Sequence, residues 1–231
     1  MAHPSDHPGP FALVADVDRP ELSDADLHHL VRVLRLRPGA PLTVGDGAGR
    51  WRPARLDHGV EATGPVEAVP RPAPALCVGF ALVKGDKPEL VVQKLTELGI
   101  DRIVPFRAAR SVVHWDDAKA AKAVDRLRLV ARAAVAQSHR PWLPEVADVT
   151  SLTDLVGEPG VALAQRADGA VLTEGCTTVL VGPEGGWTEE ELGLPVEHVG
   201  LGSHVLRAET AAIAAGVLLV AGRARTAAPG S

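Results

Sequence analysis

The chain has 231 residues, enough for one large domain or two small ones, and either arrangement can bury a hydrophobic core. Its 46% hydrophobic and 23% charged residues are typical of a globular protein and exclude a disordered one. No apolar stretch reaches the roughly 18 residues of a membrane span, and the N-terminus lacks the basic start and apolar core of a secretory signal. We therefore expect a cytoplasmic protein with no membrane partner, in which Cys77 and Cys176 are free thiols.

The net charge of −5 argues against a surface that binds nucleic acid everywhere, because phosphate contacts need positive charge. Two segments are nevertheless basic. Residues 30–55 contain six arginines against one acid, and residues 102–140 contain nine lysines or arginines against three aspartates. Two solvated helix faces would explain this pattern as well. Their occurrence in an otherwise acidic chain favours contact with an anionic partner.

The first seventy residues alternate short β-like runs with turn residues, at 11–14, 41–44, 50–56 and 65–69. Residues 24–36 have a helical pattern that places Leu27, Leu30, Val31 and Leu34 on one stripe, with Ser23 or Asp24 as the N-cap. This predicts a small barrel with one or two helices. The proline-rich segment 69–75 then predicts a domain boundary, with domains at 1–72 and 73–231.

From residue 76 onwards, strands alternate with helices. Strands are predicted at 76–83, 100–106, 161–165, 177–182 and 196–202, and helices at 87–99, 116–138 and about 209–224. This alternation predicts an α/β domain in which helices cover both faces of a parallel sheet.

A glycine-rich loop, LVGPEGGWTEEEL at 180–192, lies between a predicted strand and an acidic segment. Thr188 and Glu191 have the spacing of a capping box, and Trp187 and Leu192 that of a hydrophobic staple, so a helix should begin there. The loop would then leave the carboxyl end of a parallel strand, where α/β proteins bind ligands. A tight turn with only a structural role is the alternative.

The ligand of this loop is not expected to be a phosphate. The chain has neither the G-x-x-x-x-G-K-[ST] motif nor the G-x-G-x-x-G motif, and Glu184 would repel a phosphate. A carboxylate among open backbone amides suits a ligand with sugar hydroxyls, an adenine edge and a positive centre. S-adenosylmethionine has these groups.

A second segment, LGSHVLRAETAAIAAG at 201–216, also leads from a strand through glycine into a helix. The alanines at the start of that helix are typical of core packing. Arg207, Glu209 and Thr210 at its beginning are polar, and burying them is unfavourable without a ligand or partner.

Together these two segments resemble the ribosomal RNA small subunit methyltransferase E family, a branch of the SPOUT methyltransferases. The resemblance extends in order through HHLVRVLRLRPG at 28–39, FALVKGDK with VQKLTELGI at 80–100, IVPFRAARSVV at 103–113 and AQSHRPWLPEV at 136–146. The chain departs from the family pattern at Ala136, where a glutamate is expected, and at its start, where a short arginine-aromatic opening is expected.

The resemblance implies a C-terminal SPOUT parallel sheet with a deep trefoil knot, an N-terminal PUA-like RNA-binding barrel, and a homodimer. It also implies that S-adenosylmethionine is held by three loops that follow strands. The residues expected to bind the cofactor are Leu163, Gly182, Pro183, Glu184, Gly185, Gly186, Leu201, Gly202, Ser203, Leu206, Glu209 and Thr210.

The implied reaction is methylation of N3 of a uridine in 16S ribosomal RNA, with the free RNA or the small ribosomal subunit as partner. A developing uracil anion needs cationic donors, for which we select Arg140 and Arg207. The RNA is expected to contact Arg32, Arg35, Arg37, Arg50 and Arg52. No metal is expected, because the adjacent His28 and His29 lack a third ligand at suitable spacing. A SPOUT methyltransferase acting on transfer RNA and a non-catalytic RNA-binding assembly protein are the alternatives.

Overall fold

The computed structural model describes residues 2–83, 85, 87–111, 113, 115–166, 172–173 and 175–227. The chain divides into two compact units. Unit 1 comprises Met1–Pro72 with Arg132–Leu143, and unit 2 comprises Ala73–Ala131 with Pro144–Ser231. The long helix α3 (Asp117–Ser138) therefore contributes its last turns to unit 1, whereas the domain boundary expected from the sequence would keep the whole helix within 73–231.

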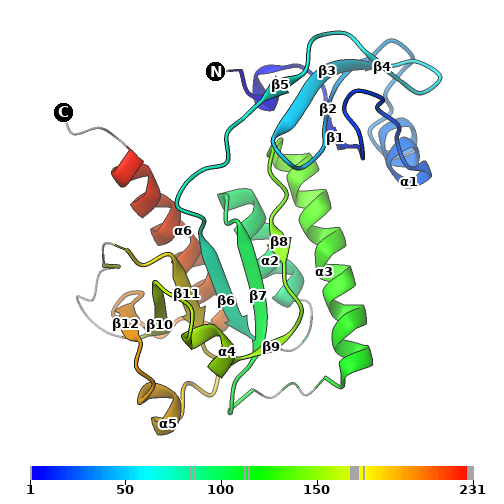
Figure 1. The fold of residues 1–231 in the computed structure, drawn as a ribbon. Coiled ribbons are helices and arrows are strands. Elements are labelled where there is room, and N and C mark those ends of the chain that lie inside the picture. The colour runs from blue at the N-terminus through cyan, green and yellow to red at the C-terminus, as the bar shows by residue number, and fades with distance from the viewer. Residues whose placement is uncertain are drawn as a thin grey trace. The chain divides into compact units, whose positions relative to one another are not determined.

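Unit 1 consists mainly of short strands (Figure 1). Its elements are η1 (Pro4–Asp6), β1 (Phe11–Leu13), α1 (Asp24–His28), η2 (His29–Val33), β2 (Pro41–Gly45), β3 (Arg50–Leu56), β4 (Val60–Ala62) and β5 (Glu67–Ala68). Strand β2 pairs in parallel with β1 and antiparallel with β3, and β3 also pairs antiparallel with β4 and β5. The small β-rich N-terminal part that the sequence predicts is present.

Two buried clusters stabilise unit 1. One includes Val17, Leu30, Leu42 and Val44, and the other packs Phe11, Leu13 and Trp51 against Val135 of α3. His139, the residue after α3, lies beside Phe11 with its ring centroid 6.1 Å from that of the phenyl group. It is half-buried and has a left-handed backbone (φ 54°).

The helix predicted at 24–36 differs from the observed one. Ser23 is the N-cap, and the α-helix continues only to His28 before a π-helical turn follows. A π turn has one more residue than an α turn, so it rotates the following side chains out of the expected stripe. Leu30 is buried, whereas Leu27, Val31 and Leu34 are exposed. The single buried stripe predicted from the sequence was therefore wrong.

Unit 2 is an α/β layer structure. Its elements are β6 (Cys77–Ala81), α2 (Lys87–Leu98), β7 (Arg102–Arg107), the first part of α3, β8 (Glu145–Val146), β9 (Thr150–Ser151), α4 (Leu152–Val156), β10 (Val161–Gln165), β11 (Thr178–Val181), α5 (Glu189–Leu192), β12 (Glu197–Gly200) and α6 (Ala208–Ala227). The described strands form a parallel sheet in the order β12-β10-β11-β6-β7-β8, with β9 also pairing with β7. The predicted fold class is confirmed, while the trefoil knot stays a prediction.

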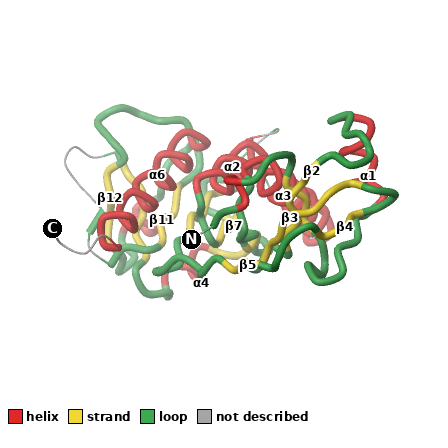
Figure 2. Tube along the Cα trace, turned by 90° about the horizontal axis from the view of Figure 1, so that it is seen from above, coloured by secondary structure: helices red, strands yellow, loops and turns green. Residues whose placement is uncertain are grey.

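Helices cover both faces of this sheet (Figure 2). On one face, α6 packs on β6 and β11, and α2 packs on α6. Gly216 permits the contact between these two helices, because a Cβ atom there would lie 2.6 Å from a methyl carbon of Leu95. On the other face, Leu152 and Leu155 of α4 join a cluster with Phe106, Leu163 and Leu180. Alternate residues of each strand therefore enter opposite layers of core, as a sheet covered on both faces requires.

Candidate functional site

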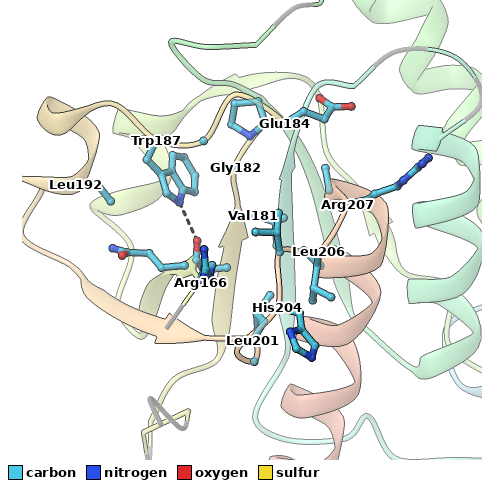
Figure 3. Close-up of a pocket in the computed structure, with 18 residues that line it drawn as sticks. Arg166, Val181, Gly182, Glu184, Trp187, Leu192, Leu201, His204, Leu206 and Arg207 are labelled. Carbon is cyan, nitrogen blue, oxygen red and sulfur yellow. Dashed lines mark hydrogen bonds between the residues drawn. The ribbon is translucent and has the colours of Figure 1, made fainter. Parts of the chain in front are cut away.

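A pocket of about 470 Å³ lies at the carboxyl ends of β10, β11 and β12, within the range of roughly 300–1,000 Å³ that small-molecule sites occupy. Its walls come from three segments, each of which follows one of these strands (Figure 3). The lining residues are Ala164, Gln165, Arg166, Val181, Gly182, Pro183, Glu184, Gly186, Trp187, Leu192, Leu201, Gly202, His204, Val205, Leu206, Arg207, Ala208 and Ala211. Neighbouring parallel strands end at the same edge of a sheet, so these segments are brought together although they lie far apart in sequence.

The glycine-rich segment leaves β11 as a tight turn. The amide of Gly186 donates to the carbonyl oxygen of Pro183 at 2.9 Å, and Gly186 has a φ of 70°, a left-handed conformation that favours glycine. Helix α5 then begins with the predicted capping box, in which the side chains of Thr188 and Glu191 accept from each other's backbone amides. The turn and the start of α5 are thus determined by local sequence.

Trp187 connects this turn to the neighbouring strand. Its indole Nε1 donates to the carbonyl oxygen of Ala164 at 2.8 Å, which is the dashed line in Figure 3. Its ring stacks parallel to that of Phe106, with 6.1 Å between the centroids. Gly182 is required beside it, because a Cβ atom there would come within 2.9 Å of the indole. Trp187 therefore forms part of the pocket wall and is held in place by two other strands.

The loop after β7 supports the same turn from outside the pocket. The Nη1 atom of Arg110 donates to the carbonyl oxygens of Gly185 at 3.2 Å and Trp187 at 3.0 Å. The adjacent amide of Ala109 donates to the buried carboxylate of Glu191 at 2.8 Å. The two bonds from Arg110 hold carbonyl groups of the turn, and the bond from Ala109 holds the side chain of Glu191 in α5. Together they help to fix the backbone of the turn.

Three charged side chains from different elements meet beside the pocket. Lys87 Nζ lies 3.0 Å from Oε1 of Glu184 and 3.5 Å from Oε2 of Glu209. The hydrogen bond that Lys87 donates to Glu184 raises the pKa of Lys87, so the lysine stays charged. Oε2 of Glu209 is buried and has no hydrogen-bond partner among the described residues. Glu184 and Glu209 thus place two carboxylates at this side of the site, and carboxylates suit a cationic ligand.

The third wall follows β12. Gly202 has a φ of 125°, and a Cβ atom there would meet nothing within 4 Å, so the chain passes an open space in a conformation that side chains rarely adopt. Arg166, after β10, donates from Nε to the carbonyl oxygen of Ser203 at 3.3 Å and so joins two of the walls. The exposed side chain of Arg207 extends away from Trp187 in Figure 3.

Most residues expected to bind the cofactor gather at this pocket. Those that line it are Gly182, Pro183, Glu184, Gly186, Leu201, Gly202 and Leu206, together with the predicted catalytic residue Arg207. Gly185, Ser203, Glu209 and Thr210 belong to the same segments but do not line the cavity. Leu163 is a fully buried core residue one position before Ala164, which does line it.

The remaining predicted residues lie in unit 1. Arg140 belongs to it together with the end of α3, and its backbone amide donates to the carbonyl oxygen of Val135 at 3.2 Å. Arg50 forms an ion pair with Asp18 at 2.8 Å. Arg52 donates to the carbonyl oxygens of Gly64, at 2.7 and 3.0 Å, and of Val17, at 3.3 Å. Arg50 and Arg52 thus contribute to the structure of unit 1, whereas Arg32, Arg35 and Arg37 are exposed.

Sequence reasoning missed four residues that shape the pocket: Lys87, Arg110, Arg166 and His204. Arg166 directly follows the strand predicted at 161–165, and His204 lies within the segment 201–216, so their positions alone could have indicated them. Lys87 begins α2 after β6, and Arg110 lies in the loop after β7. Only the sheet order, in which β11 pairs with β6 and β6 with β7, brings them near the glycine-rich turn.

Among the described residues, no group of three or more His, Cys, Asp or Glu side chains is placed to hold a metal ion. The described helices also include none that is both long and apolar enough to cross a membrane.

Comparison with known families matches two parts of the chain to two kinds of domain. Residues 70–220 match the RNA methyltransferase domain, and residues 22–58 match the RNA methyltransferase PUA domain. Ribosomal RNA small subunit methyltransferase E of Mycobacterium bovis is 35% identical over 212 residues, which cover 81% of this chain and 80% of that protein. The chain belongs to the ribosomal RNA small subunit methyltransferase E family. The Bacillus subtilis member is 32% identical over 220 residues, with 82% of this chain and 85% of that protein covered.

Solved structures of similar proteins include one with a ligand. The ribosomal RNA small subunit methyltransferase E of Neisseria gonorrhoeae, bound to S-adenosylmethionine, has a TM-score of 0.77 and 27% identity, with 90% of this chain and 94% of that chain covered. A Legionella pneumophila protein in complex with the same cofactor has a TM-score of 0.79 and 28% identity, with 92% and 96% covered. The family resemblance and the PUA-type N-terminal domain expected from the sequence are confirmed.

Proposed function

We propose that the protein transfers a methyl group from S-adenosylmethionine to N3 of a uridine in 16S ribosomal RNA. The observation that carries the proposal is the pocket at the ends of β10, β11 and β12, in a fold whose Neisseria gonorrhoeae relative was solved with S-adenosylmethionine bound. When bound, this cofactor supplies a methyl group that is already activated by a positively charged sulfur. The proposed reaction for that reason requires no metal.

The residues of the pocket fit this ligand. Glu184 and Glu209 provide negative charge for a cation, and the buried Oε2 of Glu209 can accept a hydrogen bond. Gly186 and Gly202 line the cavity without side chains and let a ligand approach the backbone. Trp187 and Leu206 add apolar surface for a flat base. The expected cofactor-binding residues that do not line the cavity would act through the backbone of the same three segments.

The uridine is the other reactant. N3 lies on the Watson–Crick edge of uracil, so the base must be unpaired or flipped out of its stack. N3 must also lose its proton, and negative charge then spreads onto the neighbouring oxygens. Arg140 and Arg207 are the cationic donors that we propose for this charge. The rate gain would come from alignment of the reactants and from charge stabilisation.

The two parts of the chain would divide these tasks. We assign RNA binding to the PUA-like domain, residues 1–72, through Arg32, Arg35, Arg37, Arg50 and Arg52, and catalysis to the SPOUT domain, residues 73–231. Since ribosomal RNA of the bacterial relatives is made and assembled in the cytoplasm, we place the protein there as well.

We further propose that the protein acts as a homodimer through α6. Between Glu209 and Arg223 this helix has no charged residue, and it exposes Val217 and Leu218. An exposed helix face without charge is typical of a surface that another copy covers. Val217→Glu should shift the mass in solution from dimer to monomer, as measured by light scattering after gel filtration. A wild-type protein that is monomeric at micromolar concentration would refute the dimer.

The reaction can be tested directly. The protein is incubated with methyl-labelled S-adenosylmethionine and either 16S ribosomal RNA or small ribosomal subunits from a strain that lacks the activity, and nuclease digests are analysed by mass spectrometry. We expect 3-methyluridine at one position. Label in transfer RNA instead would favour the alternative methyltransferase. Cofactor binding by calorimetry without any RNA methylation would refute the proposed reaction.

A further inference from the structure

Lys87 contacts two of the segments that form the pocket. It is the first residue of α2, and its Nζ lies 3.0 Å from Oε1 of Glu184 and 3.5 Å from Oε2 of Glu209. Glu184 belongs to the glycine-rich turn after β11, and Glu209 lies in the first turn of α6, where the segment that follows β12 ends. One ammonium group therefore holds the turn and the start of α6 together.

The two carboxylates depend on this lysine because they lie close to each other. Both are within 3.5 Å of the same nitrogen atom, and charged carboxylates at such a separation repel each other. The side chain of Glu209 is only 14% exposed, and its Oε2 has no hydrogen-bond partner among the described residues. Water therefore screens this carboxylate poorly, and the nearby ammonium group of Lys87 compensates its charge.

The charge of Lys87 acts against the cation that the carboxylates attract. S-adenosylmethionine carries a sulfonium, whereas S-adenosylhomocysteine, which remains after the methyl group has left, has a neutral sulfur. Their adenosine and amino-acid parts are the same. A charge at the wall of the pocket therefore changes the affinities for the two molecules differently, whereas a change in the shape of the pocket affects both. Glu184 lines the pocket and bonds to Lys87, so the lysine is placed to exert such an effect.

We propose that Lys87 is a positioning residue of the cofactor site that also sets its preference between S-adenosylmethionine and S-adenosylhomocysteine. Its side chain allows two carboxylates to share one side of the empty pocket, and its charge reduces the advantage of the sulfonium over a neutral sulfur. The inference rests on the proposed function only in taking S-adenosylhomocysteine as the product. The binding of both molecules can be measured without any RNA.

Lys87→Met removes the charge and keeps an unbranched side chain. Binding of S-adenosylhomocysteine should weaken about tenfold, because the turn and α6 lose the bonds that connect them. Binding of S-adenosylmethionine should weaken only about twofold, because the carboxylates then attract the sulfonium without an opposing charge. The ratio of the two dissociation constants, measured by isothermal titration calorimetry, should therefore rise about fivefold. Lys87→Arg keeps a charged donor and should leave this ratio within about twofold of the wild type.

Glu209→Gln tests the sign of the effect. It removes a negative charge beside the same nitrogen atom and nearly preserves the shape of the side chain, so the ratio should fall about fivefold. Combined with Lys87→Met, it should bring the ratio back to within about twofold of the wild type, because one charge of each sign is then missing. A residue that only supports the structure would not shift the ratio in this pattern.

Lys94→Met is the matched control, because Lys94 lies on the same helix and pairs with Glu97, three residues further along it. It should leave both affinities unchanged. Equal losses of affinity for the two molecules in Lys87→Met would overturn the proposal, since Lys87 would then support only the shape of the pocket. Unchanged affinities for both would overturn it as well. Thermal unfolding shows whether Lys87→Met is folded, and Lys87→Gln, which also lacks the charge, takes its place if it is not.

These outcomes differ from a failure of the proposed function. If the wild-type protein methylates 16S ribosomal RNA and the ratio does not change in Lys87→Met, the role of Lys87 is refuted and the function stands. If the ratio changes as expected but the wild-type protein methylates no RNA, the role of Lys87 in the cofactor site stands and the function fails.

Discussion

Arg110 and Gly185 lie in direct contact across two loops of unit 2. The Nη1 atom of Arg110 donates to the carbonyl oxygen of Gly185 at 3.2 Å, and a Cβ atom on Gly185 would lie 3.1 Å from the Cβ of Arg110. The pair therefore leaves room for little more than a hydrogen atom at position 185. Since Gly185 lies between Glu184 and Gly186, which both line the pocket, the shape of the cavity depends on this contact.

Gly185→Val should weaken binding of S-adenosylmethionine by at least tenfold, about 1.4 kcal/mol. The branched side chain would push Arg110 away and release the carbonyl groups that it holds. Isothermal titration calorimetry measures the change. Gly157→Ala, at a helix end where the nearest atom to a new Cβ would be 3.8 Å away, should bind normally. Unchanged affinity in a folded Gly185→Val protein would mean that the turn has no role in cofactor binding.

Trp187→Phe should reduce cofactor affinity by about three- to tenfold and the free energy of unfolding by about 1–2 kcal/mol. The substitution keeps an aromatic ring beside Phe106 but removes the Nε1 donor, so the carbonyl oxygen of Ala164 loses its partner at the pocket wall. Trp142→Phe is a matched control, because Trp142 Nε1 makes the same kind of bond to Val69 in unit 1, at 2.9 Å. It should lower stability to a similar extent without affecting cofactor binding.

Arg140→Ala should lower the single-turnover methylation rate by about 10²-fold or more, which is the scale for losing one oriented donor to a developing anion. RNA affinity should change far less, because this interaction would strengthen only in the transition state. The backbone bond from residue 140 to Val135 survives the substitution, so α3 should still end normally. Rapid-quench kinetics with Arg132→Ala, which replaces an exposed arginine of α3, provide the comparison. A normal rate with weakened RNA binding would make Arg140 a residue that only positions RNA.

Arg223→Ala should lower the free energy of unfolding by about 3–5 kcal/mol, as expected when one partner of a buried ion pair is removed. Asp101 is 1% exposed and Arg223 11%, and the guanidinium also donates to the carbonyl oxygens of Gly99 and Pro74. These bonds attach the end of α6 to the beginnings of β6 and β7. Urea denaturation should show the loss, whereas the exposed Arg225→Ala should stay within about 0.5 kcal/mol of the wild type. A similarly small effect of Arg223→Ala would contradict this role.

The Cys77 thiol should resist alkylation in the folded protein. Burial raises the pKa of Cys77 from 9.0 to about 12, so the thiol stays neutral where an exposed thiol ionises. Burial of the neutral thiol therefore contributes its full stabilisation of the folded protein below pH 9. This contribution is lost as the pH rises towards 12, because the thiol of the unfolded chain ionises first and ionisation then favours unfolding. Iodoacetamide at pH 8.5, followed by mass spectrometry, should label the less buried Cys176 first and Cys77 only in denaturant. Rapid labelling of native Cys77 would contradict the prediction.

Local sequence patterns were sufficient where the deciding interactions are local. The capping box of Thr188 and Glu191 follows from a spacing of three residues, and it was found as predicted. The apolar run around Val78 and the one around Leu180 each form a strand buried on both faces, since a parallel sheet covered by helices requires such runs. The arrangement of these strands in one parallel sheet follows from the alternation of strands and helices. The three loops that form the pocket were expected from the family resemblance.

The tertiary structure decided what depends on residues far apart in the chain. Lys87 reaches Glu184, and Arg110 reaches Gly185, only because β6 and β7 pair next to β11. The helix at 24–36 shows the same limit, because a period of 3.6 residues predicts a stripe that a single π turn rotates away from the core. The sequence by itself thus determined the fold class, since local spacing and buried strand patterns carry that information, and the resemblance of its motifs to a known family indicated the kind of protein and the segments of its pocket. The contacts of Lys87 and Arg110 with the glycine-rich turn depend on the order of the strands. The exposure of Val31 and Leu34 depends on one irregular helical turn. The chain has no periodic signal for either feature.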